Sequence, residues 1–148
     1  KVSGVDGLIV VDLSFPDNKN FAKLCKKNSI CFVQLIAPTT TVKRMKEIIK
    51  NSHEMIYMIS TISTTGSALK YSIKKIIDNY NIIKRIRPSK NVVIGFGITE
   101  KTISNLRSAD GLVVGSAICR EITRSLKDRQ NPVTNVSKLV RKLKNKII

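Results

Sequence analysis

Two stretches of this sequence decide its fold: Asn91-Val-Val-Ile-Gly-Phe-Gly-Ile-Thr-Glu100 and, one unit later, Ala109-Asp-Gly-Leu-Val-Val-Gly-Ser-Ala-Ile118. Each begins with a short run of β-branched and aliphatic residues, continues with a glycine beside small or polar residues, and ends in a segment that can begin a helix. A buried strand that leads into a glycine turn and a helix N-terminus directs several backbone N–H groups at one point, which suits a phosphate. The two stretches therefore predict neighbouring parallel strands that share one anion.

The rest of the chain repeats this order of strand and helix. Apolar runs predict further strands at residues 4–13, 30–36 and 55–59, and a polar loop is predicted at 60–67. Helical periodicity predicts helices at 17–28, from residue 42, at 70–87, at 100–108, after residue 116 and around 136–143. The first run is a continuous aliphatic stretch that ends at Asp12, which is typical of a strand buried on both faces of a parallel sheet. Strict alternation predicts a parallel sheet with right-handed crossovers, built from five strand–helix units in a single α/β domain over residues 1–148.

Composition limits the classes of partner. The chain of 148 residues has 27 Lys and Arg against 10 Asp and Glu, a net charge of +17. Such an excess is found in nucleic-acid-binding modules, which we keep as an alternative. However, the lysines fall on the polar faces of several helices without interleaved aromatic residues, so we expect no nucleic-acid partner. The apolar runs are too short to span a bilayer, and we expect no membrane partner.

Few residues are suited to acid–base or metal chemistry. Asp12 is the carboxylate at the C-terminal end of an apolar strand, so it is a candidate for a supporting role in catalysis, with a loop-bracing role as the alternative. His53 falls on the opposite rim, where we expect it at the surface. Cys25, Cys31 and Cys119 have neither paired nor C-x-x-C spacing, which favours reduced thiols in a cytoplasmic protein. We therefore expect no metal site.

Four segments together resemble a known family. They are Gly4-Val-Asp-Gly-Leu-Ile-Val-Val-Asp12, the strand end from Tyr57 to Ser60 with the following Thr65-Gly66, Gly95-Phe-Gly-Ile98, and Gly115-Ser-Ala-Ile118. In this order and at this spacing they resemble the tryptophan synthase alpha chain, over essentially the whole sequence. The resemblance implies a (β/α)8 TIM barrel, which takes about 250 residues when complete. It also implies that this chain is a C-terminal fragment, a partial barrel of five βα units that lacks the first three.

The resemblance further implies an activity and its partners. The family is a carbon–carbon lyase of tryptophan biosynthesis that cleaves indole-3-glycerol phosphate by a retro-aldol step into indole and glyceraldehyde 3-phosphate. Indole then passes to a beta chain, which holds pyridoxal phosphate and joins indole to serine, in an alpha2-beta2 tetramer. The family's catalytic Glu and Asp lie upstream of this sequence, so the resemblance implies no catalytic residue and no cofactor in this chain, and an inactive fragment.

The resemblance also implies which residues bind the substrate. By position, the phosphate-binding residues are Gly66, Gly97, Gly115 and Ser116, and the substrate pocket consists of Ile9, Tyr57, Thr65, Gly95 and Phe96, with Thr65 anchoring the mobile loop after the sixth barrel strand. In two places this sequence departs from the family: Ser14 replaces a usual proline, and Ser63 replaces the first glycine of a Gly-Val-Thr-Gly loop. Another sugar-phosphate barrel enzyme, an epimerase or a phosphoribosyl isomerase, is the alternative within the same fold.

Overall fold

The computed structural model describes residues 3–13, 16–64, 67–70, 72–95, 97–98, 100 and 102–148. The helices and strands follow in the order β1 (Gly7–Leu8), α1 (Asn18–Lys27), β2 (Cys31–Phe32), β3 (Gln34–Ile36), α2 (Val42–Asn51), β4 (Met55–Ile59), β5 (Thr61–Thr64), β6 (Ser67–Lys70), α3 (Ile73–Ile86), β7 (Asn91–Gly95), the 3-10 helix η1 (Ile103–Leu106), β8 (Gly111–Val113), α4 (Ser116–Lys127) and α5 (Pro132–Lys144).

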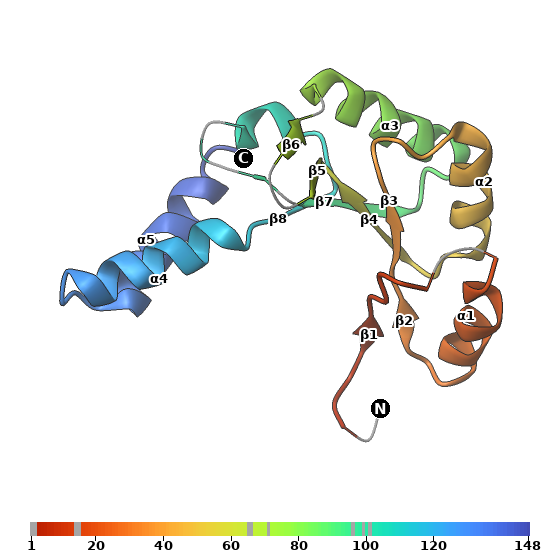
Figure 1. Cartoon of the computed structure of the whole chain (residues 1–148), viewed down its shortest axis with the longest axis horizontal. Helices are drawn as coiled ribbons and strands as arrows, with labels where there is room; N and C mark the ends of the chain where they lie inside the picture. Colours follow the sequence, from red (N-terminus) through yellow and green to blue (C-terminus); the bar gives the residue numbers. More distant parts are fainter. Residues whose placement is uncertain are drawn as a thin grey trace.

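Parallel strands form the centre of the structure. Four of them make one sheet in the order β3-β4-β7-β8, and β1 and β2 make a second parallel pair. Helices α1, α2 and α3 lie along the outer side of the strands, whereas α4 and α5 lie side by side and extend away from the far end (Figure 1). The predicted α/β architecture with parallel strands is therefore confirmed.

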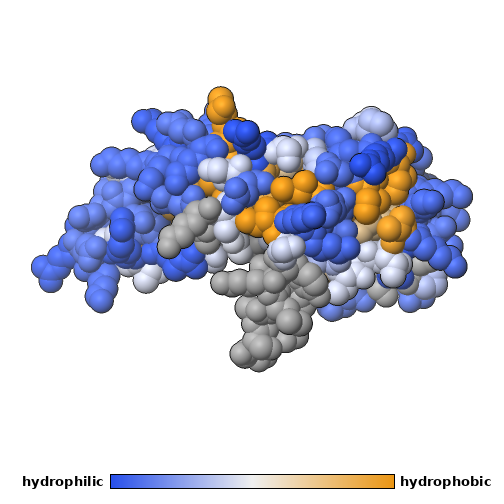
Figure 2. Space-filling view, turned by 90° about the horizontal axis from the view of Figure 1, so that it is seen from above, coloured by the Kyte–Doolittle hydropathy of each residue, from blue (hydrophilic) through white to orange (hydrophobic). Residues whose placement is uncertain are grey.

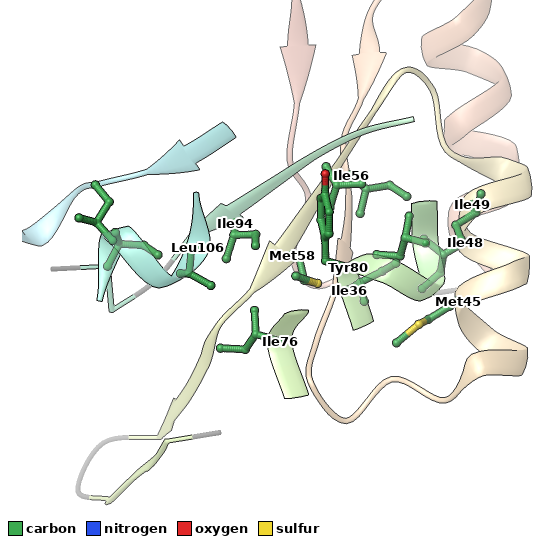
Figure 3. Packing of buried hydrophobic residues seen from close by; sticks show 14 of the residues in the cluster. Ile36, Met45, Ile48, Ile49, Ile56, Met58, Ile76, Tyr80, Ile94 and Leu106 are labelled. Atoms are coloured by element: carbon green, nitrogen blue, oxygen red, sulfur yellow. The ribbon is translucent and has the colours of Figure 1, made fainter. Parts of the chain in front are cut away.

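The core lies between this sheet and the helices that cover its outer face. Alternate residues of β4 and β7, namely Ile56, Met58, Val92 and Ile94, are each at most 1% exposed. They pack with residues of α2 and α3, such as Met45, Ile76 and Tyr80 (Figure 3). Burial of this apolar surface provides the main stabilisation of the sheet, at about 25 cal/mol per Å².

Three helices begin at side chains that cap their free backbone N–H groups. Thr41 accepts a hydrogen bond from the N–H of Arg44 at the start of α2, and Ser72 accepts one from Lys75 at the start of α3. Asn131 accepts from Val133 and Thr134, directly before the proline that opens α5. These residues explain why the helices begin where they do.

Three details differ from the sequence-based prediction. The run at 30–36 forms two strands that pair with different neighbours. The N–H of Val33 donates to the carbonyl of Leu8 in β1, whereas β3 pairs with β4. The predicted loop at 60–67 belongs largely to an antiparallel hairpin, β5–β6, which interrupts the strict alternation. The helix predicted at 100–108 is only the four-residue η1, whose buried residues Ile103 and Leu106 have the three-residue spacing of a 3-10 helix.

The surface is dominated by hydrophilic residues. Seen from above, these residues cover most of the molecule and leave a band of hydrophobic residues in its middle (Figure 2). In the part of the chain that the structure describes, no helix is long and apolar enough to cross a membrane.

Candidate functional site

The two glycine turns lie next to each other because their strands pair in register. In the parallel pair β7–β8, Gly95 is opposite Val113. Gly97 and Gly115 each come two residues after these paired residues, so both turns leave the C-terminal edge of the sheet at the same level. Gly97 has φ +68°, a backbone conformation that favours glycine. The predicted adjacency of the two turns is therefore present in the structure.

The second turn leads directly into a helix whose N-terminus has no side-chain cap. Gly115 is the N-cap of α4 and Ser116 its first residue, and glycine has no side chain that could accept a hydrogen bond there. A Cβ added to Gly115 would meet no atom within 4 Å. The first backbone N–H groups of a helix have no partner within the helix and lie at the positive end of its dipole. The start of α4 thus offers donors to an anion, with open space beside Gly115.

The first turn is held in place by residues of β4. A Cβ added to Gly95 would lie 1.8 Å from the hydroxyl oxygen of Tyr57 and 2.4 Å from the ring carbon Cζ, so the ring lies against the glycine backbone. The Gly95 carbonyl accepts hydrogen bonds from the Ser60 N–H at 2.9 Å and from the Ser60 hydroxyl at 2.8 Å. Burial raises the pKa of the Tyr57 phenol above its ordinary value. Tyr57 and Ser60 therefore fix the end of β7 from which the turn departs.

The inner face of the sheet is less covered than the outer face. Tyr57 and Ile59 of β4, and Val93 of β7, point away from the core and are only partly buried, and Val113 of β8 is 39% exposed. These residues are apolar or aromatic and occupy the positions that alternate with the fully buried ones. The face beneath the glycine turns is thus an apolar surface on which an aromatic group can pack.

The remaining predicted site residues are scattered or lie outside the described residues. Ile9 follows β1 and is 49% exposed, and Asp12 is exposed on the turn beyond it. Thr65, Gly66 and Phe96 lie outside the described residues. Among the residues that the structure describes, no group of three His, Cys, Asp or Glu could hold a metal ion.

Sequence reasoning missed the role of Ser60. Its side chain is 4% exposed and links the end of β4 to the end of β7 through Gly95. A polar residue directly after an apolar strand could have predicted such a link, since a buried polar residue needs a hydrogen-bond partner. His53, predicted at the surface, is instead partly buried.

A hollow of about 210 Å³ lies near this edge, between the segment after β1 and strands β3 and β4. Val10, Val11, Leu35, Ile59 and Arg44 contribute to its wall. None of the predicted phosphate-binding or pocket residues that the structure describes, including Gly97, Gly115 and Tyr57, is among those that line it.

Comparisons with known proteins agree with this arrangement. The family model "Tryptophan synthase alpha chain" matches residues 1–148. The tryptophan synthase alpha chain of Pelagibacter ubique is 63% identical over 99% of this chain and 56% of its own length. The tryptophan synthase a2b2 complex of Pyrococcus furiosus contains a chain that is 33% identical, with a TM-score of 0.71, over 96% of this chain and 55% of that one.

A more distant structure shares the fold. The alpha subunit of tryptophan synthase from Legionella pneumophila has a TM-score of 0.78 at 24% identity, and the match covers 99% of this chain and 53% of that chain. The present chain thus spans about half the length of the relatives that it matches. Its parallel strands correspond to part of a TIM barrel, as predicted. The chain belongs to the tryptophan synthase alpha chain family.

Proposed function

We propose that this chain is the C-terminal part of a tryptophan synthase alpha subunit, which cleaves indole-3-glycerol phosphate by a retro-aldol step into indole and glyceraldehyde 3-phosphate. The observation that carries the proposal is the pair of glycine turns after β7 and β8, in register through Gly95 and Val113, with the uncapped start of α4 at the second turn. The 63% identity to an alpha chain of that name supports the choice of substrate.

In this proposal the chain binds and orients the phosphate end of the substrate. The phosphate accepts hydrogen bonds from the backbone N–H groups of Gly97, Gly115 and Ser116, and from Gly66, which lies outside the described residues. The glycine at the N-cap of α4 supports this role, because it has no side chain that would compete with a ligand for the first N–H groups. The dipole of α4 favours the negative charge at the same point.

The indole end packs on the inner face of the sheet. Tyr57 provides an aromatic surface, and Gly95 lets the Tyr57 ring lie against the backbone of β7. Ile9 and the undescribed Thr65 and Phe96 complete this pocket. The phenol of Tyr57 stays neutral at ordinary pH, since burial raises its pKa further, and a neutral ring suits an apolar substrate group.

The remaining parts of the reaction belong to residues outside these 148. We propose that the first three βα units of the barrel precede this chain, that they carry the catalytic Glu and Asp, and that the chain by itself is inactive. We also propose a cytoplasmic alpha2-beta2 assembly in which pyridoxal phosphate is bound by the beta chain. The a2b2 complex of the Pyrococcus furiosus relative supports this assembly.

The test joins this chain to the N-terminal part of the Pelagibacter ubique relative and measures indole release from indole-3-glycerol phosphate. We expect the hybrid to release indole and the chain alone to release none. A folded hybrid, as judged by circular dichroism, that releases no indole in the presence of a beta chain would overturn the proposed activity.

A substitution in the hybrid tests the phosphate site. Ser116→Asp places a carboxylate beside the proposed phosphate, and repulsion at this short range is expected to raise KM about 100-fold. An acidic residue in the first turn of a helix stabilises the helix, so the variant should remain folded. Ser137→Asp, at an exposed position of α5, is the matched control and should leave KM within about twofold. An unchanged KM in Ser116→Asp would exclude the start of α4 as the phosphate site.

A further inference from the structure

A second hollow, of about 390 Å³, opens at the opposite edge of the sheet from the glycine turns. It lies between α1, the connection from α2 to β4, and the connection from α3 to β7. Its wall contains six cationic side chains, one acidic residue and a few neutral ones: Lys19, Ala22, Lys23, Lys26, Phe32, Lys50, Asn51, Ser52, His53, Glu54, Arg87 and Lys90. This is a size at which small-molecule sites are found.

The position of α1 explains how three lysines come to line this hollow. Phe21 packs edge-to-face on Phe32 of β2, with ring centroids 5.2 Å apart, and Cys25 is buried one turn later. Lys19, Lys23 and Lys26 have the i, i+4, i+7 spacing of a single helical face. The apolar anchor therefore fixes α1 so that this basic face borders the hollow.

Lys90 contributes a buried positive charge. It is 5% exposed, and its ammonium group donates to the main-chain carbonyls of Ser52 and His53, which carry no full charge. Burial lowers the pKa of Lys90 and the positive charge of Arg87 lowers it further, and these effects outweigh the opposite effects of Cys31 and Glu54. A cation taken out of water is stabilised by an opposite charge nearby. Glu54 supplies part of that charge, but six cationic side chains share the wall with it, so an anion in the hollow would supply more.

His53 gives an independent indication of a missing partner. Its Nδ1 atom is buried and has no hydrogen-bond partner among the described residues, although His53 lines the hollow. Buried polar atoms in proteins are satisfied in the great majority of cases by protein, water or ligand. A ligand that accepts hydrogen bonds would pair with the surrounding lysines in a wall that also contains the His53 ring.

We propose that this hollow binds a small polyanion with two or more linked phosphate groups. The cations come from three separate segments, α1, the end of α2 and the 87–90 connection, so a ligand with several charged groups contacts more of them than a single phosphate does. A nucleic-acid strand fits less well, because Phe32, the one Phe, Tyr or Trp among the described residues of the wall, is 2% exposed and already packed on Phe21. This site is independent of the proposed retro-aldol function and lies at the other edge of the sheet.

The first experiment measures the binding of inorganic pyrophosphate by isothermal titration calorimetry. The pocket variant Lys23→Ala/Lys26→Ala removes two exposed lysines of the basic face of α1, and the matched control Lys43→Ala/Lys46→Ala removes two exposed lysines of α2 that do not line the hollow. Loss of two nearby charges is expected to weaken binding about tenfold or more in the pocket variant. The control has the same net charge and should stay within about twofold, because distant charges are screened by salt.

The second experiment locates the ligand. His53 is the single histidine of the chain, so its ring proton resonances need no assignment. Adding pyrophosphate should shift these resonances with the same dissociation constant as the calorimetry. The substitutions in the calorimetry are at exposed lysines, and circular dichroism checks that each variant is folded.

Three results would overturn the proposal. The first is no measurable pyrophosphate binding by the unaltered chain at low salt. The second is an equal loss in the pocket and control variants, which indicates attraction by net charge alone. The third is tighter binding of a single-stranded oligonucleotide that depends on both pairs of lysines, which indicates a nucleic-acid surface instead.

Discussion

Two groups of polar atoms at opposite edges of the parallel sheet, those around Asp110 and those of the two glycine turns, are used in opposite ways. At the N-terminal edge, Asp110 accepts hydrogen bonds from the Lys84 ammonium at 2.9 and 3.1 Å, from the Tyr80 hydroxyl at 3.2 Å and from the Val92 N–H at 2.9 Å. At the C-terminal edge, the turn at Gly97 and the uncapped start of α4 leave backbone donors available. Asp110 thus satisfies its neighbours within the fold, whereas the glycine turns at the C-terminal edge offer their backbone N–H groups to a ligand, as is usual for barrel folds.

The largest expected effect concerns the N-terminal edge. Asp110→Ala removes the ion pair between Asp110 and Lys84, whose two side chains are each 27% exposed. The substitution also leaves the N–H of the fully buried Val92 without its acceptor. We expect the free energy of unfolding to fall by about 3 kcal/mol, because an unsatisfied buried donor adds to the lost bonds. Urea denaturation measures this change.

The control for this prediction is Asp78→Ala on the exposed side of α3. It removes the same charge from the neighbouring helix and should change the free energy of unfolding by less than about 0.5 kcal/mol. Equal effects of the two substitutions would show that net charge, and not the bonds of Asp110, determines stability.

A smaller effect is expected at the C-terminal edge. Gly95→Ala places a methyl group where the Tyr57 ring now lies, and the ring must move. Because Tyr57 is only partly buried, the ring has room to shift, and we expect a loss of about 1–2 kcal/mol. In a chain that carries Tyr57→Ala, the substitution Gly95→Ala should lower the free energy of unfolding far less. A double-mutant cycle by urea denaturation measures this coupling, and additive losses would show that the Tyr57 ring does not restrict position 95.

Local patterns in the sequence predicted much of the fold. The apolar run at 55–59 corresponds to β4, and the stripe Val42, Met45, Ile48 and Ile49 corresponds to α2, because side-chain periodicity depends only on near neighbours. The hairpin β5–β6 was missed because its first strand is rich in Ser and Thr, which the polar composition assigned to a loop. The break at Val33 was missed because it depends on which strands lie on either side.

Some features of the candidate site could likewise be predicted from the sequence, and others could not. The adjacency of the Gly97 and Gly115 turns followed from two repeated segments and the general rule that successive parallel strands are neighbours. The contact of Tyr57 with Gly95, the bonds of Ser60 and the basic hollow around Lys90 depend on register between residues far apart in sequence. Neither composition nor side-chain periodicity predicts how these distant residues are aligned.

The smallest expected effect is the pH dependence of the N-terminal edge. Burial raises the pKa of Asp110, but the hydrogen bonds from Lys84 and the Val92 N–H, with the charge of Lys84, outweigh it and hold the pKa below its ordinary value. The carboxylate therefore stabilises the fold at pH values above the unfolded pKa of about 3.9, and this contribution is lost as the pH falls through the folded pKa. In urea denaturation, the stability gap between the unaltered chain and Asp110→Asn should be constant from about pH 7 to 5 and shrink below about pH 4. The control Asp78→Asn should show no such stability gap from the unaltered chain. If the gap for Asp110→Asn widened toward low pH, interactions other than the ionised carboxylate would hold the N-terminal edge.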